Sequence, residues 1–268
     1  LNIHGLLLLG VEGCNATISG KELDIVEYRN YLMSKPEIGA LEWKDSRCSF
    51  QPFRRFKIDI RPEIVTIKDE DALPNGGKNN HLSPSEWQAV LESNEDYVLI
   101  YTRNFYETDV GLFDGALDLR LRKFSDFAEK VRALGIEQDK KVLMYCTGGI
   151  RCEKAILEMQ KDGYNNVFQL EGGILKYLEE FPNKSFKGEC FVFDHRVSVD
   201  QELQPSKDYK LCPHCGNPAK ELINCRLCGK EKKVCHYCLE KEELHTCSKN
   251  CAHHYQRRGL VSKIAQSV

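Results

Sequence analysis

The sequence has no long hydrophobic run. Its strongest apolar stretch, Leu6 to Leu9, is far too short to span a bilayer. Neither a basic leader nor a cleavage site accompanies this stretch. We therefore interpret it as a core strand, and we expect neither a membrane partner nor secretion.

The sequence also has no excess of charge of one sign. Its formal net charge is −2, so any nucleic-acid binding must be regional, and no DNA partner is expected. No motif for a flavin, a haem or a non-haem iron is visible, so we expect no organic cofactor. With 41% hydrophobic and 29% charged residues, the 268-residue chain has the composition of an ordinary soluble protein with one to three domains.

Cysteine, in contrast, is abundant. Thirteen are present, and eight of them fall in close pairs near the carboxyl end. Clustered pairs indicate thiolates that bind metal in a reducing compartment, rather than a disulfide scaffold. We therefore expect the protein in the cytoplasm. We predict two structural zinc sites of four cysteines each, with the pairing left open. The predicted ligands are Cys212, Cys215, Cys225, Cys228, Cys235, Cys238, Cys247 and Cys251.

A different cysteine lies in the most informative motif. Cys146 follows an apolar strand-like run, and Thr147, Gly148, Gly149, Ile150 and Arg151 lead into a helix-compatible stretch. Loop amides and a helix N-terminus stabilise negative charge, so the pKa of this thiol should fall. Arg151 adds a cation for an oxyanion or a persulfide. We predict a reactive, ionised sulfur that faces solvent, although a buried structural cysteine is the simpler alternative.

The length of this loop separates two chemistries. Four residues lie between Cys146 and Arg151, as in rhodanese sulfurtransferases. Cysteine phosphatases use five, which makes a wider ring that admits a phosphate. Phosphatase activity is therefore not expected.

The order of predicted elements divides the chain into four parts. Residues 1–70 read as strand, strand, helix and two extended segments, at Phe50 to Phe56 and at Ile64 to Ile67. This order fits a ferredoxin-like or acylphosphatase-like α+β domain that lacks its first strand and helix, which we expect to lie upstream of Leu1. A linker at 71–80 follows.

Residues 81–185 alternate strands with helices, and Ser83, Pro84 and Glu86 form a capping box at the start. The alternation predicts a parallel α/β sheet with helices on both faces. Residues 186–204 connect it to the Cys-rich zinc module at 205–258.

These motifs together resemble the rhodanese-domain tRNA wobble-uridine hydroxylases. Departures from the usual family pattern occur at Cys14, at Ala16 and at Tyr101, where rhodaneses have an aspartate that helps to organise an arginine. The resemblance covers most of residues 5–200. It is carried by the segments at 12–20, 103–107, 111–116, 146–155, 169–174 and 188–194.

The resemblance implies a function. Members of this family hydroxylate C5 of the wobble uridine with molecular oxygen and need the loop cysteine. For this chain it implies Cys146 as the catalytic residue, Arg103 as a supporting residue, oxygen as co-substrate and the tRNA anticodon loop as partner. The cysteine could add to C6 of uracil and so activate C5.

Two basic clusters are candidates for tRNA contacts. Arg54, Arg55 and Lys57 alternate with two phenylalanines, although a solvated strand face explains them equally well. Arg120, Arg122 and Lys123 are expected near the edge that holds Cys146, where a flipped-out base would enter.

Two other functions stay open. Taken alone, the loop favours a sulfurtransferase in which Cys146 carries a persulfide. A non-catalytic module that binds tRNA or protein is the third hypothesis. For Cys152, a core position on its helix is favoured over a partner in a transient disulfide.

Overall fold

The computed structural model describes residues 1–38, 41–69, 72 and 80–266, with side chains up to residue 258. Two compact units divide the chain: residues 1–195 with 199–204, and residues 196–198 with 205–268. Most of the linker predicted at 71–80 lies outside the described residues. Within the described part of the chain, no helix is long and apolar enough to cross a membrane.

The first part of the larger unit is a three-stranded sheet with one helix. The strand order is β2-β1-β3, with β1 antiparallel to β2 and parallel to β3. The ring of Tyr28, from the helix, meets Phe56 of the sheet edge-on at 5.9 Å between centroids. The elements are β1 (His4–Gly10), β2 (Gly13–Ser19), α1 (Glu22–Met33) and β3 (Phe56–Ile60).

Two extended segments of this region were placed wrongly. The structure starts β3 only at Phe56, and it has no strand at 64–67. The reason lies in the hydrogen bonds of the second segment. The amides of Ile64 and Val65 donate to the Glu12 carboxylate, and the amides of Ile67 and Lys68 donate to that of Glu63. Side chains thus replace the neighbouring strand as acceptors.

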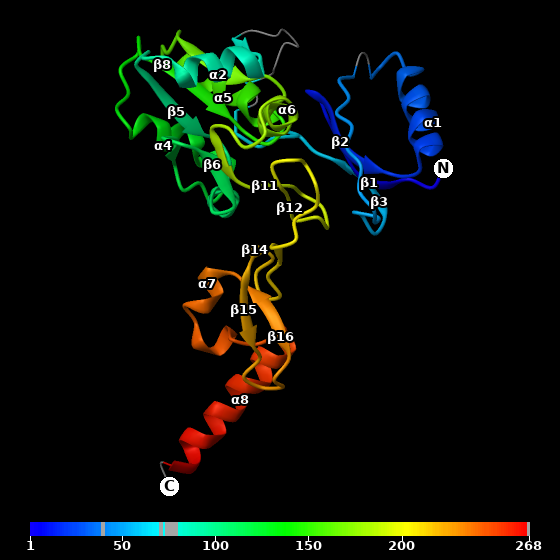
Figure 1. The fold of residues 1–268 in the computed structure, drawn as a ribbon, viewed down its shortest axis with the longest axis vertical. Helices are drawn as coiled ribbons and strands as arrows, with labels where there is room; N and C mark the ends of the chain where they lie inside the picture. Colours follow the sequence, from blue (N-terminus) through cyan, green and yellow to red (C-terminus); the bar gives the residue numbers. More distant parts are fainter. Residues whose placement is uncertain (39–40, 70–71, 73–79, 267–268) are drawn as a thin grey trace. The chain divides into compact units, whose positions relative to one another are not determined.

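A parallel five-stranded sheet forms the centre of the larger unit, as the alternation predicted (Figure 1). Its order is β4-β9-β8-β5-β7, and every pairing is parallel. The strands are β4 (His81–Leu82), β5 (Tyr97–Tyr101), β7 (Leu117–Asp118), β8 (Lys141–Tyr145) and β9 (Val167–Leu170).

Helices cover both faces of this sheet because successive strand residues point to opposite sides. Along β8, Val142 and Met144 pack with α4 and α5, whereas Leu143 and Tyr145 pack with α2 and α6. The predicted capping box of α2 is present at Ser83. The helical elements are α2 (Pro84–Glu92), α3 (Phe105–Thr108), the 3₁₀ turn η1 (Phe124–Asp126), α4 (Phe127–Arg132), α5 (Ile150–Lys161) and α6 (Gly173–Glu180).

Short strands complete the larger unit. β6 (Gly111–Phe113) pairs antiparallel with β10 (Phe186–Gly188), and β11 (Cys190–Phe191) follows. Of β12 (Ser198–Val199), only Val199 belongs to this unit. The strand expected at 188–194 is therefore confirmed only in its first part.

The smaller unit is built from two hairpins, two short helical elements and one longer helix, α8. β13 pairs with β14 and β15 with β16, both antiparallel. Gly216 and Gly229 each follow a Cys-x-x-Cys pair with φ of +86° and +74°, a conformation that favours glycine. The elements are β13 (Lys210–Leu211), β14 (Pro218–Ala219), β15 (Glu221–Asn224), β16 (Glu231–Val234), α7 (His236–Leu239), η2 (Glu242–Leu244) and α8 (Lys249–Gln266).

Candidate active site and metal sites

The Cys146 loop, residues 146–151, lies between the end of β8 and the first turn of α5. The amide of Gly149 donates to the Cys146 sulfur at 3.0 Å, and Gly149 has a φ of +98° that suits this turn. The amide of Arg151 also donates to the sulfur. The predicted cradle of amides around the thiol therefore forms.

The carbonyl oxygens of residues 146–149 all accept hydrogen bonds. The Cys146 and Thr147 oxygens accept from the amides of Ile174 and Leu175, at 2.9 and 3.1 Å. The next two, at Gly148 and Gly149, accept from the Lys44 ammonium at 2.7 Å and from the Cys152 amide at 2.9 Å. These four oxygens thus bond to groups around the loop, while the Gly149 and Arg151 amides bond to the sulfur.

Gly173 permits this packing against α6. A Cβ atom there would come within 2.6 Å of the Cys146 and Thr147 oxygens, and its φ of +66° disfavours other residues. The Gly172-Gly173 pair of the 169–174 segment thus lets the start of α6 lie directly on the Cys146 loop.

The sulfur does not face solvent, so that expectation is wrong. Cys146 is 1% exposed, because α6, Arg151 and its own loop enclose it. Burial raises the pKa of the Cys146 thiol. The hydrogen bond from the Cys152 thiol, the charge of Arg151 and the two loop amides outweigh it and lower that pKa well below its usual value.

Cys152 takes the core position on its helix that the sequence favoured, and it also contacts the site. It is fully buried, but its thiol faces Cys146 and lies 3.4 Å from the Thr102 hydroxyl. Burial and the hydrogen bond to Cys146 raise the pKa of Cys152 well above its usual value. Cys152 therefore stays protonated as a donor while Cys146 ionises.

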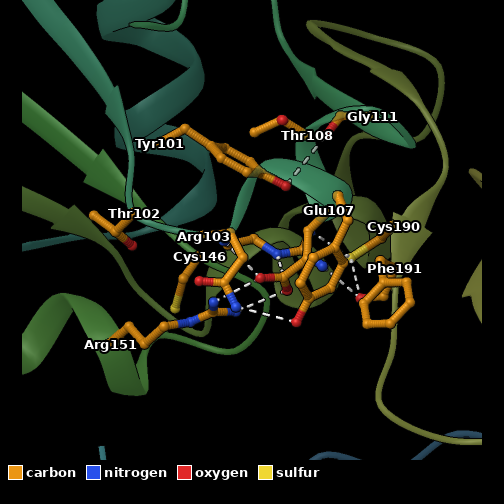
Figure 2. Close-up of polar contacts among 12 residues, drawn as sticks. Tyr101, Thr102, Arg103, Glu107, Thr108, Gly111, Cys146, Arg151, Cys190 and Phe191 are labelled. Carbon is orange, nitrogen blue, oxygen red and sulfur yellow. Dashed lines mark hydrogen bonds and ion pairs between the residues drawn. The ribbon is translucent and has the colours of Figure 1, made fainter. Parts of the chain in front are cut away.

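Arg151 is held by a carboxylate that sequence reasoning did not single out. Both of its terminal nitrogens reach Glu107, at 2.7 and 3.0 Å, and Arg103 Nε donates to the same carboxylate at 2.8 Å. Figure 2 shows Glu107 joined by dashed lines to both arginines. Burial raises the pKa of Glu107, but the two guanidinium charges outweigh it and bring that pKa to about 2.

The buried charges of this network leave a place for a thiolate. Arg103 and Glu107 are each 0% exposed, and Arg151 is nearly as buried. Two guanidinium cations therefore face one carboxylate, and an ionised Cys146 supplies a second negative charge. Charges removed from water are stable only when they are paired, so the network favours the thiolate.

Arg103 is anchored on every side even though Tyr101 replaces the usual aspartate. Its Nη2 donates to the Phe191 carbonyl at 2.6 Å, and the Tyr101 ring lies 5.5 Å from the guanidinium carbon. The Tyr101 hydroxyl donates to the Gly111 carbonyl instead (Figure 2). Glu107 lies in α3, four residues after Arg103, and this spacing was the signal in the sequence for the pair.

The segments 12–20 and 146–155, which both carried the resemblance, meet at a second buried ion pair. Lys154 of α5 is almost fully buried, and its ammonium lies 2.7 Å from a Glu12 oxygen and 2.8 Å from a Glu63 oxygen. The helix that carries Arg151 is thereby joined to the first sheet.

Neither basic cluster contributes a side chain to the Cys146 network described above. Arg54, Arg55 and Lys57 are exposed at the start of β3, but Phe56 packs on Tyr28. Arg120, Arg122 and Lys123 follow β7 and are exposed. The end of β7 pairs with Tyr101 of β5, and so does the end of β8, which Cys146 follows directly. Arg120 pairs with Asp109 and Asp118. Both clusters remain predictions as tRNA contacts.

The cysteine-rich unit forms two groups of four thiols. In each group all ligand atoms lie within 4.8 Å of one another, which fits a tetrahedral metal ion. The pairs interleave: Cys212 and Cys215 join Cys235 and Cys238, whereas Cys225 and Cys228 join Cys247 and Cys251. The ring nitrogens of His214 and His245 contact backbone carbonyls instead.

Comparisons with known proteins agree with this architecture. Three family models match: "UPF0176 acylphosphatase like domain" at 1–64, "Rhodanese-like domain" at 83–180 and "Rhodanase C-terminal" at 187–252. The chain is 49% identical over 263 residues to a tRNA uridine(34) hydroxylase of Bdellovibrio bacteriovorus, covering 96% of this chain and 74% of the relative.

Proteins of the same name from other bacteria are also similar. That of Rhizobium etli is 41% identical over 268 residues, covering 98% of this chain and 84% of the relative. That of Picosynechococcus is 39% identical over 241 residues, covering 89% of this chain and 80% of the relative. The chain belongs to the tRNA uridine(34) hydroxylase family. The resemblance inferred from the motifs is confirmed, and so is the rhodanese-like fold with its acylphosphatase-like and cysteine-rich parts.

Proposed function

We propose that this chain hydroxylates C5 of the wobble uridine in tRNA, with Cys146 as the nucleophile. The observation that carries the proposal is the similarity to tRNA uridine(34) hydroxylases along almost the whole chain. The lowered pKa of Cys146 supports it, because a thiolate is the reactive form of cysteine.

The proposed chemistry starts at C6 of uracil. The Cys146 sulfur adds to C6, and the electron pair of the C5–C6 double bond moves to C5 and the O4 carbonyl. The enolate takes up molecular oxygen at C5. A dithiol, as the two-electron donor, cleaves the O–O bond, so that one oxygen stays as hydroxyl and the other leaves as water. Loss of the C5 proton then expels the thiolate and restores the double bond.

The tRNA anticodon loop is the proposed partner. Arg120, Arg122 and Lys123 follow β7 at the edge of the sheet where β8 leads to Cys146. Cations at this edge would hold phosphates while the base is turned out of its stack. Arg54, Arg55 and Lys57 are proposed as a second contact. Because tRNA is the substrate, we propose the cytoplasm as the place of action.

Zinc is the proposed metal of both cysteine groups. Four thiolates saturate a zinc ion and leave no open position, so the metal would supply folding free energy rather than chemistry. The cysteines of each group would hold one ion.

Nucleoside analysis tests this function. Purified chain, unmodified tRNA, air and a dithiol should give 5-hydroxyuridine, and ¹⁸O₂ should label the new hydroxyl. A strain without the gene that keeps its full content of 5-hydroxyuridine would remove the proposal, if no second enzyme makes it.

A persulfide-carrying sulfurtransferase is the second candidate, because a rhodanese-like model matches 83–180 and the loop has the length found in sulfurtransferases. Thiosulfate should then load Cys146 with one extra sulfur atom, read by intact-mass spectrometry. Loading without any tRNA product would favour this candidate over hydroxylation.

A further inference from the structure

Most of the contacts described above that hold the Cys146 loop come from α5 and α6. The contact from Lys44 comes from outside the parallel sheet and its helices. Lys44 lies in the irregular segment 41–49, between α1 and β3. Its ammonium donates to the Gly148 carbonyl at 2.7 Å and to the Gly172 carbonyl at 3.1 Å. These carbonyls belong to the loop that carries Cys146 and to the turn that begins α6.

The Gly148 carbonyl has a special place in this loop. In a trans peptide the C=O and the following N–H point in opposite directions. The N–H of this peptide belongs to Gly149 and donates to the Cys146 sulfur at 3.0 Å. Lys44 and the sulfur therefore bind the two ends of one peptide group.

We propose that Lys44 is a positioning residue of the Cys146 site. By binding the Gly148 oxygen, it holds the Gly148–Gly149 peptide with its N–H directed at the sulfur. The peptide needs such a partner because two glycines flank it, and glycine allows either orientation at little cost. A cation on the oxygen also polarises the peptide and strengthens the N–H···S hydrogen bond.

The proposal gives the N-terminal part of the chain a task in catalysis. The other three loop carbonyls accept from amides of α5 and α6, so those contacts would survive without residues 1–69. Only the Lys44 contact depends on them. The inference rests on Cys146 being the nucleophile of the proposed function, but its first test needs no tRNA.

Three full-length variants test it: Lys44→Met, Lys44→Arg and, as a matched control, Arg47→Met. Arg47 belongs to the same segment, and its side chain is 93% exposed. The rate at which iodoacetamide alkylates Cys146 is followed against pH by peptide mass spectrometry. In K44M the apparent pKa of Cys146 should rise by about one unit, so alkylation below that pKa should slow about tenfold.

The controls decide what this change means. K44R should restore the profile, because a guanidinium also donates to carbonyl oxygens, and R47M should match the unchanged chain. With tRNA, K44M should lower kcat and leave KM nearly unchanged. Superimposable profiles of K44M and the unchanged chain would overturn the proposal, as would an effect on KM alone, which would make Lys44 a tRNA contact. If the unchanged chain makes no 5-hydroxyuridine while K44M still shows the shift in alkylation, only the proposed function is overturned.

Discussion

The chain uses cysteine in two contrasting surroundings. In the Cys146 loop one sulfur receives two backbone amides and the Cys152 thiol, with the Arg151 charge beside it. In the cysteine-rich unit sulfurs gather in groups of four, with their ligand atoms within 4.8 Å of one another. The first arrangement stabilises a single negative charge, and the second assembles four that need a metal.

The comparison shows that neighbours decide what a cysteine does. Around Cys146 the compensating charge is fixed in the protein, by Arg151 and Arg103 with only Glu107 between them. That leaves a sulfur lone pair for chemistry. In the metal groups the compensating charge must come from an ion, and each sulfur is consumed as a ligand.

The largest effect is expected in the metal groups. A structural zinc ion contributes about 10–16 kcal/mol to folding, so losing one ligand should empty its group. Because the pairs interleave, C212S/C235S should keep one zinc ion per chain, whereas C212S/C225S should keep none. Plasma mass spectrometry counts the metal, with C48S as control. Equal zinc in the two double variants would contradict the pairing, and alkylation of Cys146 should change in neither.

The second effect concerns turnover. C146S should lower formation of 5-hydroxyuridine by at least about 10³-fold, the scale of deleting a nucleophile. Nucleoside mass spectrometry after single turnover measures it. Cys14 lies on β2, away from this loop, so C14S should behave as the unchanged chain. A C146S chain that forms 5-hydroxyuridine at the rate of the unchanged chain would show that Cys146 is not the nucleophile.

The third effect is on stability. E107Q leaves Arg103 and Arg151 without their shared carboxylate, which should cost about 3–5 kcal/mol in urea unfolding at neutral pH. The Glu107 pKa is lowered to about 2, so its stabilisation is present above about pH 4.5 and is lost as the pH falls toward 2. The difference between E107Q and the unchanged chain should therefore shrink over that window.

Glu153 supplies a matched control for this variant. It pairs with His81 at 2.8 Å, but its side chain is 33% exposed. E153Q should cost less than about 1 kcal/mol. Equal costs for the two variants would show that Glu107 is not the special partner of the arginines.

Much of the fold followed from the sequence because its signals are local. Continuous apolar runs marked β5 and β8, and Ser83 with Glu86 marked the start of α2. The strand predicted at 64–67 was wrong because the carboxylates of Glu12 and Glu63 accept hydrogen bonds from its amides. No local pattern in the sequence marks these side chains as acceptors.

The sequence predicted the Cys146 loop itself but not the contacts that distant residues make with it. The Cys146 cradle follows from adjacent residues, whereas the burial of its sulfur depends on Gly173, which lies 27 positions on from Cys146 in the sequence. The contact of Lys44 spans 104 positions. The interleaved metal groups likewise arise from folding of the whole unit, which is why sequence left the pairing open.

The smallest effect expected is at Cys152. Its thiol donates to Cys146, so C152A should raise the pKa of Cys146 by about one unit. Alkylation of Cys146 below that pKa should slow accordingly, while C190A should change it less. A C152A profile identical to that of the unchanged chain would mean that the amides and Arg151 suffice.

The ultraviolet absorbance of the Cys146 thiolate tests the central claim most directly. Subtracting the titration of C146S from that of the unchanged chain removes the metal-bound sulfurs and leaves residue 146 alone. We expect one thiolate that is already present at neutral pH and that is lost only well below the usual cysteine pKa. A difference spectrum that appears only near pH 9 would contradict the account.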